Sequence, residues 1–161
     1  MSALSRLDLR NFWLRSTQSV AFVVFVLSVG LSLAGIPARN RELIANKDNF
    51  YPLVSGEFVV GYNLFLDILL AGVFFGSAVM IIAYRSKEPL ALFLAASLAA
   101  LGATETGMSD ALINPLHNPG GVIWHTPVFA LRSFAMGAGL ILLYSFPDGR
   151  WTPRWTRPLA Y

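Results

Sequence analysis

The sequence predicts an all-α membrane protein with four transmembrane helices, and its composition leads to that class. Apolar residues make up 55% of the 161 residues, whereas charged residues make up only 13%. Soluble domains carry about twice that charged share. A water-soluble domain of this length buries only about two-thirds of its surface, so it could not hide this many apolar side chains. The lipid bilayer is therefore the expected solvent for most of the chain.

Four apolar runs are long enough to cross a bilayer, which takes about 20 residues of α-helix. They extend over residues 18–36, 58–84, 90–108 and 127–146, and none alternates as a β-strand does. Pro37 is expected to end the first run, and Pro127 suits the first turn of the fourth. We expect a single membrane domain over residues 1–161 with a basic, tryptophan-rich tail at 147–161.

The basic residues outside the runs indicate the orientation. Eight lie on the side of the two termini and three on the other side: Arg6, Arg10, Arg15, Arg85, Lys87, Arg150, Arg154 and Arg157 against Arg39, Arg41 and Lys47. Because positively charged loops are retained in the cytoplasm, both termini are expected to be cytoplasmic. The chain is then a multi-pass membrane protein.

Composition and motifs also exclude several kinds of function. The chain has no cysteine, which rules out disulfides, iron–sulfur clusters and thiol catalysis. The net charge of +3 comes from residues that flank apolar runs, so lipid head groups are their expected partner and nucleic acid is not. Phosphate loops and nucleophile motifs do not occur, and His117 and His125 form only a weak metal signal. We expect no enzyme activity, no cofactor and no bound metal.

Three ionisable residues lie inside the apolar runs: Asp67, Glu105 and Arg132. A charge at the middle of a bilayer costs about 2.5–3.5 kcal/mol on insertion scales, so each needs a partner or water. All three fall in the outer halves of their runs, which predicts an intramembrane polar cluster with Arg132 paired to Asp67 or Glu105. This cluster is either an ion pair that fixes helix register or an outward-opening ligand or proton site, and a catalytic carboxylate pair ranks last. A charge that pointed away from the helices would instead indicate a partner subunit.

Small residues at four-residue spacing predict two faces for close helix packing. Gly72 and Gly76 form one, in the second run, and Ala135 and Gly139 form the other, in the fourth. Such faces serve contacts within a bundle or contacts with another subunit, and both interpretations stay open here.

The end of the chain carries its most distinctive motif, Tyr144-Ser145-Phe146-Pro147-Asp148-Gly149-Arg150-Trp151 followed by Pro153-Arg154-Trp155-Thr156-Arg157. It reads as a helix stop, a tight turn and a juxtamembrane anchor formed by Arg150, Trp151, Arg154, Trp155 and Arg157. The motif resembles a segment in the multi-span N-terminal membrane regions of sensor histidine kinases from Chloroflexus-like and related filamentous bacteria. Residues 35–39 and 83–88 resemble the same regions, in the same order.

The resemblance implies a membrane input module of a bacterial inner membrane, which receives a signal in the bilayer or at its outer face. The phosphoacceptor helix and ATP-binding domain of such kinases do not occur in these 161 residues, so kinase activity is not implied. One hypothesis is therefore a non-enzymatic, sensor-like membrane module. The alternative is a small accessory or structural subunit of a larger photosynthetic or respiratory membrane complex. The expected partners are the bilayer and other membrane subunits or a second copy of the chain.

Overall fold

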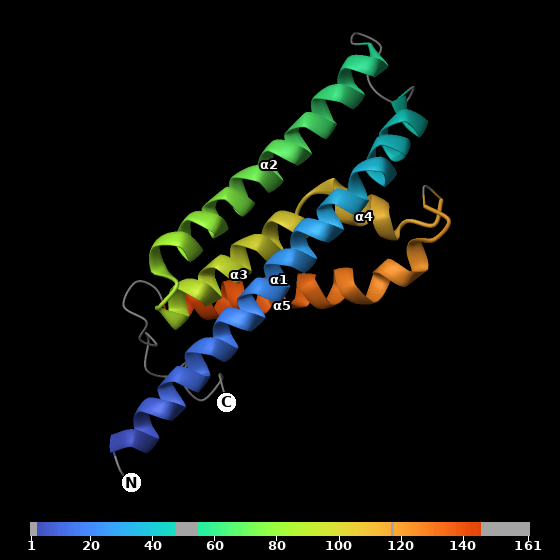
Figure 1. Ribbon diagram of the computed structural model, residues 1–161. Coiled ribbons are helices and arrows are strands. Elements are labelled where there is room, and N and C mark those ends of the chain that lie inside the picture. The colour runs from blue at the N-terminus through green and yellow to red at the C-terminus, as the bar shows by residue number, and fades with distance from the viewer. Residues whose placement is uncertain (1–2, 48–54, 117, 146–161) are drawn as a thin grey trace.

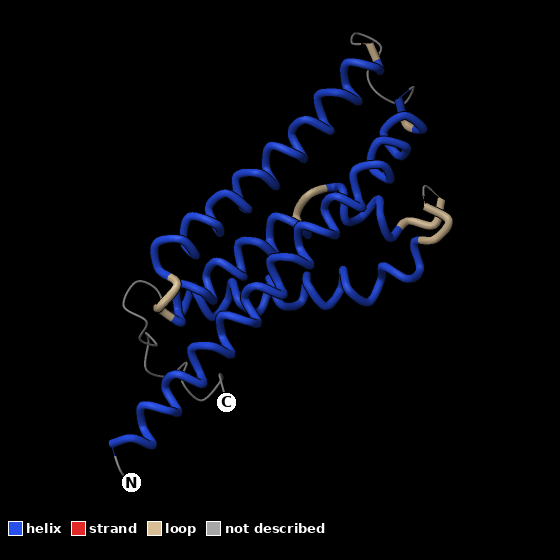
Figure 2. The backbone as a smooth tube through the Cα atoms, in the orientation of Figure 1, coloured by secondary structure: helices blue, strands red, loops and turns tan. Residues whose placement is uncertain are grey.

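The computed structural model describes residues 3–47, 55–116 and 118–145, and no strand occurs among them. The helical elements are α1 (Ala3–Ala45), α2 (Gly56–Arg85), α3 (Pro89–Thr104), α4 (Gly107–Ile113), the 3₁₀ helix η2 (Gly121–Trp124) and α5 (His125–Ser145). Figure 1 shows α1 and α2 as two long rods, and α3 packs against α1, α2 and α5. Loops are confined to the ends of the helices and to the step between α3 and α4 (Figure 2). The predicted all-α class is confirmed.

Three segments are long and apolar enough to cross a membrane, namely Leu14–Ala45, Gly56–Arg85 and Gly121–Leu143. The pair formed by α3 and α4 passes the same test together but is bent by 62° at its break. The chain therefore has three candidate spans, or four if the bent pair counts as one. The sequence predicts one continuous run from residue 90 to residue 108, and that prediction is wrong because α3 ends at Thr104.

The expectation that Pro37 ends the first span is also wrong, because α1 continues through it to Ala45. Proline lacks the N–H that would bond to the preceding turn, which normally weakens a helix. Tertiary contacts compensate beyond Pro37, where Ala38 and Leu43 are buried and α1 packs against α4. Arg39 adds ion pairs to this end of α1.

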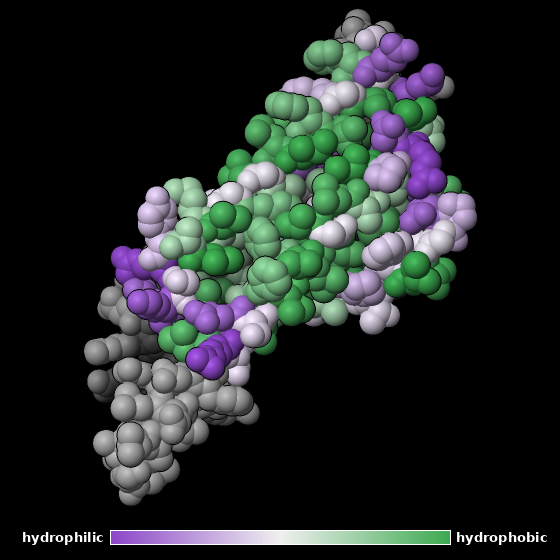
Figure 3. Space-filling model, viewed as in Figure 1, coloured by the Kyte–Doolittle hydropathy of each residue, from purple (hydrophilic) through white to green (hydrophobic). Residues whose placement is uncertain are grey.

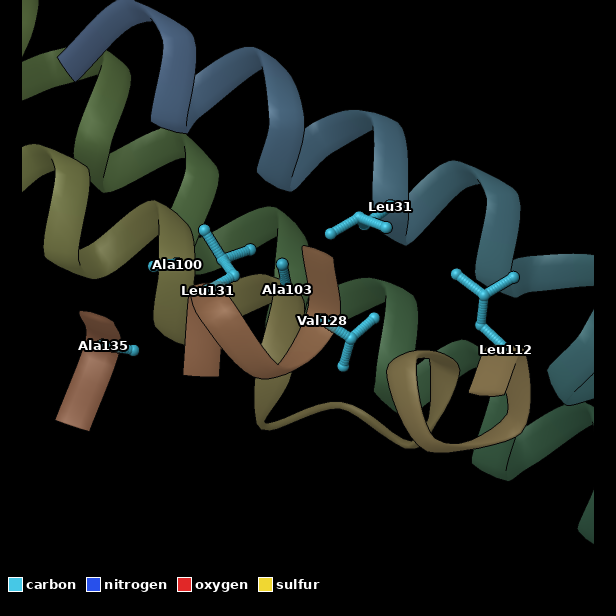
Figure 4. Packing of buried hydrophobic residues seen from close by; sticks show 7 residues of the cluster. All are labelled: Leu31, Ala100, Ala103, Leu112, Val128, Leu131 and Ala135. Atoms are coloured by element: carbon cyan, nitrogen blue, oxygen red, sulfur yellow. The ribbon is translucent and has the colours of Figure 1, made fainter. Parts of the chain in front are cut away.

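The core is built from small side chains where the helices cross. One buried cluster joins four elements and is drawn in Figure 4: Leu31 of α1, Ala100 and Ala103 of α3, Leu112 of α4, and Val128, Leu131 and Ala135 of α5. A Cβ at Gly102 would lie 2.6 Å from Cβ of Phe74, so α2 and α3 approach too closely there for any larger residue. The alanine-rich α3 is thus the central helix, with nearly every residue from Ala95 to Thr104 buried.

Large apolar side chains cover the outside of the bundle. Phe22, Val73 and Leu140 are each about three-fifths exposed, at 67%, 59% and 59%. Figure 3 shows hydrophobic residues across the middle of the visible face and hydrophilic residues gathered towards its ends. This is the pattern of a helical protein whose outer surface contacts lipid.

Candidate functional site: a charged layer around the break in the third span

The break between α3 and α4 is formed by two residues with different backbone conformations. Glu105 is still helical and its N–H bonds to the carbonyl of Leu101, whereas Thr106 is extended, at φ −90° and ψ 147°. In a continuous helix the carbonyl of Thr104 would bond to the next turn. Here it accepts hydrogen bonds from the Arg132 guanidinium at 3.0 Å and the Ser109 hydroxyl at 3.2 Å. Side chains thus replace the backbone bonds that the break removes.

Arg39 and Asp67 hold one side of the break. Nε of Arg39 lies 2.8 Å from Oδ2 of Asp67, and its Nη1 lies 2.8 Å from Oε2 of Glu42. The other carboxylate oxygen of Asp67 accepts a bond of 3.3 Å from the N–H of Gly107, the first residue of α4. A Cβ at Gly107 would overlap the Arg39 guanidinium, so glycine lets this arginine cross the start of α4.

Arg132 of α5 holds the other side. Its Nη2 donates to the Thr104 carbonyl and to Oδ1 of Asp110, the latter at 2.8 Å, and it lies 3.4 Å from the Ser109 hydroxyl. Side chains from α1, α2 and α5 therefore meet at one level around the α3–α4 break. We call this set the break layer: Arg39, Glu42, Asp67, Glu105, Asp110 and Arg132.

The structure corrects the predicted pairing within this layer. The sequence pairs Arg132 with Asp67 or Glu105, but Arg132 binds Asp110 and Asp67 binds Arg39. The prediction fails because Asp110 lies outside the predicted run 90–108 and Arg39 is considered only as an orientation signal. The bend of α4 brings Asp110 back towards α5, and the continuation of α1 beyond Pro37 brings Arg39 to α2. The spacing of Arg39 and Glu42, three residues apart, was the available sign of a helix at that point.

The two residues at the break itself, Glu105 and Thr106, have side chains that bond to no described residue. Glu105 is exposed, and it forms no ion pair or side-chain hydrogen bond with any residue that the structure describes. Thr106 is buried, and its hydroxyl has no partner within the same part of the chain. A buried hydroxyl left unpaired costs about 1–3 kcal/mol. The break is therefore tightly packed, but one of its buried polar groups, the Thr106 hydroxyl, lacks a hydrogen bond.

The predicted packing faces have different outcomes. Ala135 is 1% exposed and belongs to the core cluster. A Cβ added at Gly72, Gly76 or Gly139 would meet no atom within 4 Å, so these glycines do not carry close packing between the described helices. Close packing occurs instead at Gly35, where a Cβ would lie 2.6 Å from the carbonyl oxygen of Met108, and at Gly102.

The remaining residues that the sequence singles out are two histidines and the juxtamembrane anchor. His125 begins α5 and stacks on Phe129, with ring centroids 5.8 Å apart. His117 lies outside the described residues, as does the whole juxtamembrane anchor formed by Arg150, Trp151, Arg154, Trp155 and Arg157. Within the described ranges, no group of three metal-binding side chains comes together.

The break layer joins α1 to α2 and α4 to α5 by ion pairs around the α3–α4 break. Asp67 bonds to Arg39 and to the backbone of Gly107, whereas Glu105 forms no ion pair with a described residue, so the two carboxylates share no described contact. Comparison of the chain with protein families, curated proteins and solved structures found no match. The assignment of a function therefore rests on the arrangement of the helices and of this layer.

Proposed function

We propose that the chain is a non-enzymatic membrane module of the sensor type, which passes a change at the break layer to the opposite ends of its helices. The observation that carries this proposal is α1, one continuous helix over Ala3–Ala45 that includes Arg39 of the break layer. Figure 1 shows the N-terminal end of α1 projecting past the other helices. The amide of Gln18 donates to the carbonyl of Ser86, which marks where α2 ends beside α1. The 15 residues of α1 before Gln18 extend about 22 Å further at 1.5 Å per residue.

The contacts of α1 supply the mechanical link that such a module needs. Two contacts tie α1 to α2. The Arg39–Asp67 ion pair lies near the C-terminal end of α1, and the bond from Gln18 to the carbonyl of Ser86 lies at the C-terminal end of α2. A packed helix shifts as a unit, typically by 1–2 Å in switching proteins. The unpaired hydroxyl of Thr106 supports the break as the element that changes, because another packing of α4 could give it a partner. With the predicted orientation, the break layer lies at the outer face and the projecting end of α1 lies in the cytoplasm.

The proposal is tested by measuring the spacing at the Gln18 end after the break layer is disturbed. The chain has no cysteine, so spin labels can be placed at Ser19→Cys on α1 and Tyr84→Cys on α2. Both positions are exposed. In nanodiscs, Asp67→Asn is expected to shift or broaden the distance distribution by about 1–2 Å. The matched control is Glu57→Gln, which removes a carboxylate from the same end of α2 outside the layer. Identical distributions for Asp67→Asn and the unsubstituted chain would contradict the proposal.

The accessory-subunit function is the second candidate, and the exposed, unpaired Glu105 favours it. A charge left without a counter-ion at the surface of a membrane protein is typical of a site that another subunit completes. Extraction in mild detergent followed by native mass spectrometry separates the two candidates. A fixed set of co-purifying subunits at constant stoichiometry supports the accessory function.

A further inference from the structure

One face of α3 remains uncovered between α2 and α5. These three helices do not close around one another, because α2 and α5 each pack against α3 but make at most marginal contact with each other. Leu98 packs partly against the alanine cluster shared with α2, and Leu101 packs partly against the cluster that includes α5. Four half-buried or exposed leucines therefore form an open strip along α3 at helical spacing, which we call the leucine strip: Leu90, Leu94, Leu98 and Leu101.

Glu105 continues the leucine strip at its far end. It lies four residues after Leu101 and its backbone is still helical, so its side chain extends the same row. The nearby cations are already engaged, since Arg132 binds Asp110 and Arg39 binds both Asp67 and Glu42. Glu105 also sits at the C-terminal end of α3, where the helix dipole is negative and disfavours a carboxylate.

The depth of Glu105 makes this unpaired charge costly in a bilayer. It follows the first residue of α3, Pro89, by 16 residues, which is about 24 Å along the helix axis. The hydrocarbon core is about 30 Å thick, so Glu105 lies just inside its outer edge when Pro89 is at the inner edge. A lysine or arginine could reach the surface from this depth, whereas the shorter glutamate side chain reaches less far.

We propose that the leucine strip binds a transmembrane helix of a partner protein that carries a lysine or arginine opposite Glu105. The inference rests on the second candidate function, the accessory subunit, and names the chemistry of the subunit that would complete the site at Glu105. The leucines offer an apolar surface along α3, against which a helix packs by van der Waals contact. The ion pair with Glu105 fixes the depth and register of that helix, because a mismatched register would leave two charges in hydrocarbon.

The test uses synthetic transmembrane peptides as the partner helix. The probe is a leucine–alanine helix of about 20 residues with a single lysine about four residues from one end, at the depth of Glu105. A matched peptide has methionine in place of that lysine. Association with the chain is measured in phosphatidylcholine vesicles by energy transfer from a fluorophore at Ser86→Cys to one on the peptide. The lysine peptide is expected to bind about tenfold more tightly than the methionine peptide.

Three variants make the result specific. Glu105→Gln removes the charge of a side chain without described contacts, so the fold is kept, and it is expected to abolish the difference between the two peptides. Leu98→Ala is expected to weaken the binding of both peptides, because it removes packing contacts from the strip. Glu57→Gln, a carboxylate away from the strip, keeps the tenfold difference.

Equal binding of the two peptides to the unsubstituted chain would overturn the inference and leave the α1 spacing experiment unaffected. Self-association of the chain that is lost in Glu105→Gln would also overturn it, because a second copy would then occupy the strip.

Discussion

The two ion pairs of the break layer that join different helices, Arg39–Asp67 and Arg132–Asp110, differ in how far they are shielded from solvent. The side chains of Arg39 and Asp67 are 21% and 16% exposed, whereas that of Asp110 is 62% exposed. Asp110 lies in α4, beyond the break and towards the predicted outer surface, where water and salt screen an exposed ion pair and limit its contribution to about 0–1 kcal/mol. A hydrogen bond to a charged group that is shielded contributes about 1.5–3 kcal/mol. The Arg39–Asp67 pair is therefore expected to stabilise the fold more than the Arg132–Asp110 pair.

This difference can be measured by neutralising one carboxylate of each pair. Asp67→Asn is expected to lower the free energy of unfolding by about 2 kcal/mol, because it weakens the bonds to Arg39 and to the N–H of Gly107. Asp110→Asn is the matched variant and is expected to cost less than about 1 kcal/mol. Unfolding by dodecyl sulfate in mixed micelles, followed by circular dichroism, gives both values. Equal losses for the two variants would show that shielding does not rank these pairs.

At the scale of the elements, glycine marks where helices touch, but not at the positions that the sequence pattern indicates. Gly72 and Gly76 have the spacing of a packing motif and face open space in the described structure. Gly35 has no such spacing, yet it allows α1 to approach the backbone of α4 at Met108. The bend of α4 creates this contact, because it lays a short helix across α1.

Substitution by alanine distinguishes the two kinds of glycine. Gly35→Ala places a Cβ against the carbonyl of Met108 and is expected to cost about 1–3 kcal/mol through overpacking. Gly72→Ala adds a methyl group in open space and is expected to stabilise α2 by up to about 1 kcal/mol through helix propensity. The same unfolding titration checks both signs. A stabilising Gly35→Ala would contradict the α1–α4 contact.

At the scale of the whole molecule, the charge distribution predicts how the bundle lies in a membrane. The break layer belongs to the end of the bundle that the positive-inside rule assigns to the outside. The connections from α1 to α2 and from α4 to η2 are assigned to the same side. The loop between α2 and α3 belongs to the opposite end and contains Arg85 and Lys87. A label placed at each of these two ends therefore reports the orientation independently.

Cysteine labelling in intact cells tests this orientation on a chain that has no cysteine of its own. Leu116→Cys reports the predicted outer end, since Leu116 is 85% exposed, whereas Ser109 is only 2% exposed and would be a poor reporter. Ser86→Cys reports the predicted cytoplasmic end. An impermeant maleimide is expected to label residue 116 and to leave residue 86 unlabelled until the membrane is permeabilised. The reverse pattern would place both termini outside.

Much of the fold follows from local sequence. The second and fourth predicted runs, 58–84 and 127–146, agree with α2 (Gly56–Arg85) and α5 (His125–Ser145) to within two residues. Charged and turn-forming residues bound these runs, so their limits depend on neighbours along the chain. Hydropathy alone could not locate the end of α1, because the polar residues 39–42 interrupt the apolar pattern and are held in the helix by contacts with α2 and α4.

The sequence by itself determined that the chain is helical and apolar on its outside, and that Asp67, Glu105 and Arg132 are the costly residues of its runs. Only the tertiary structure decided which charges pair. Pairing depends on the 62° bend between α3 and α4 and on the passage of α1 through Pro37. Both depart from local helical rules, and contacts between residues far apart in sequence stabilise them. Arg39 and Asp67 are 28 residues apart, as are Arg132 and Thr104, so no local pattern connects them.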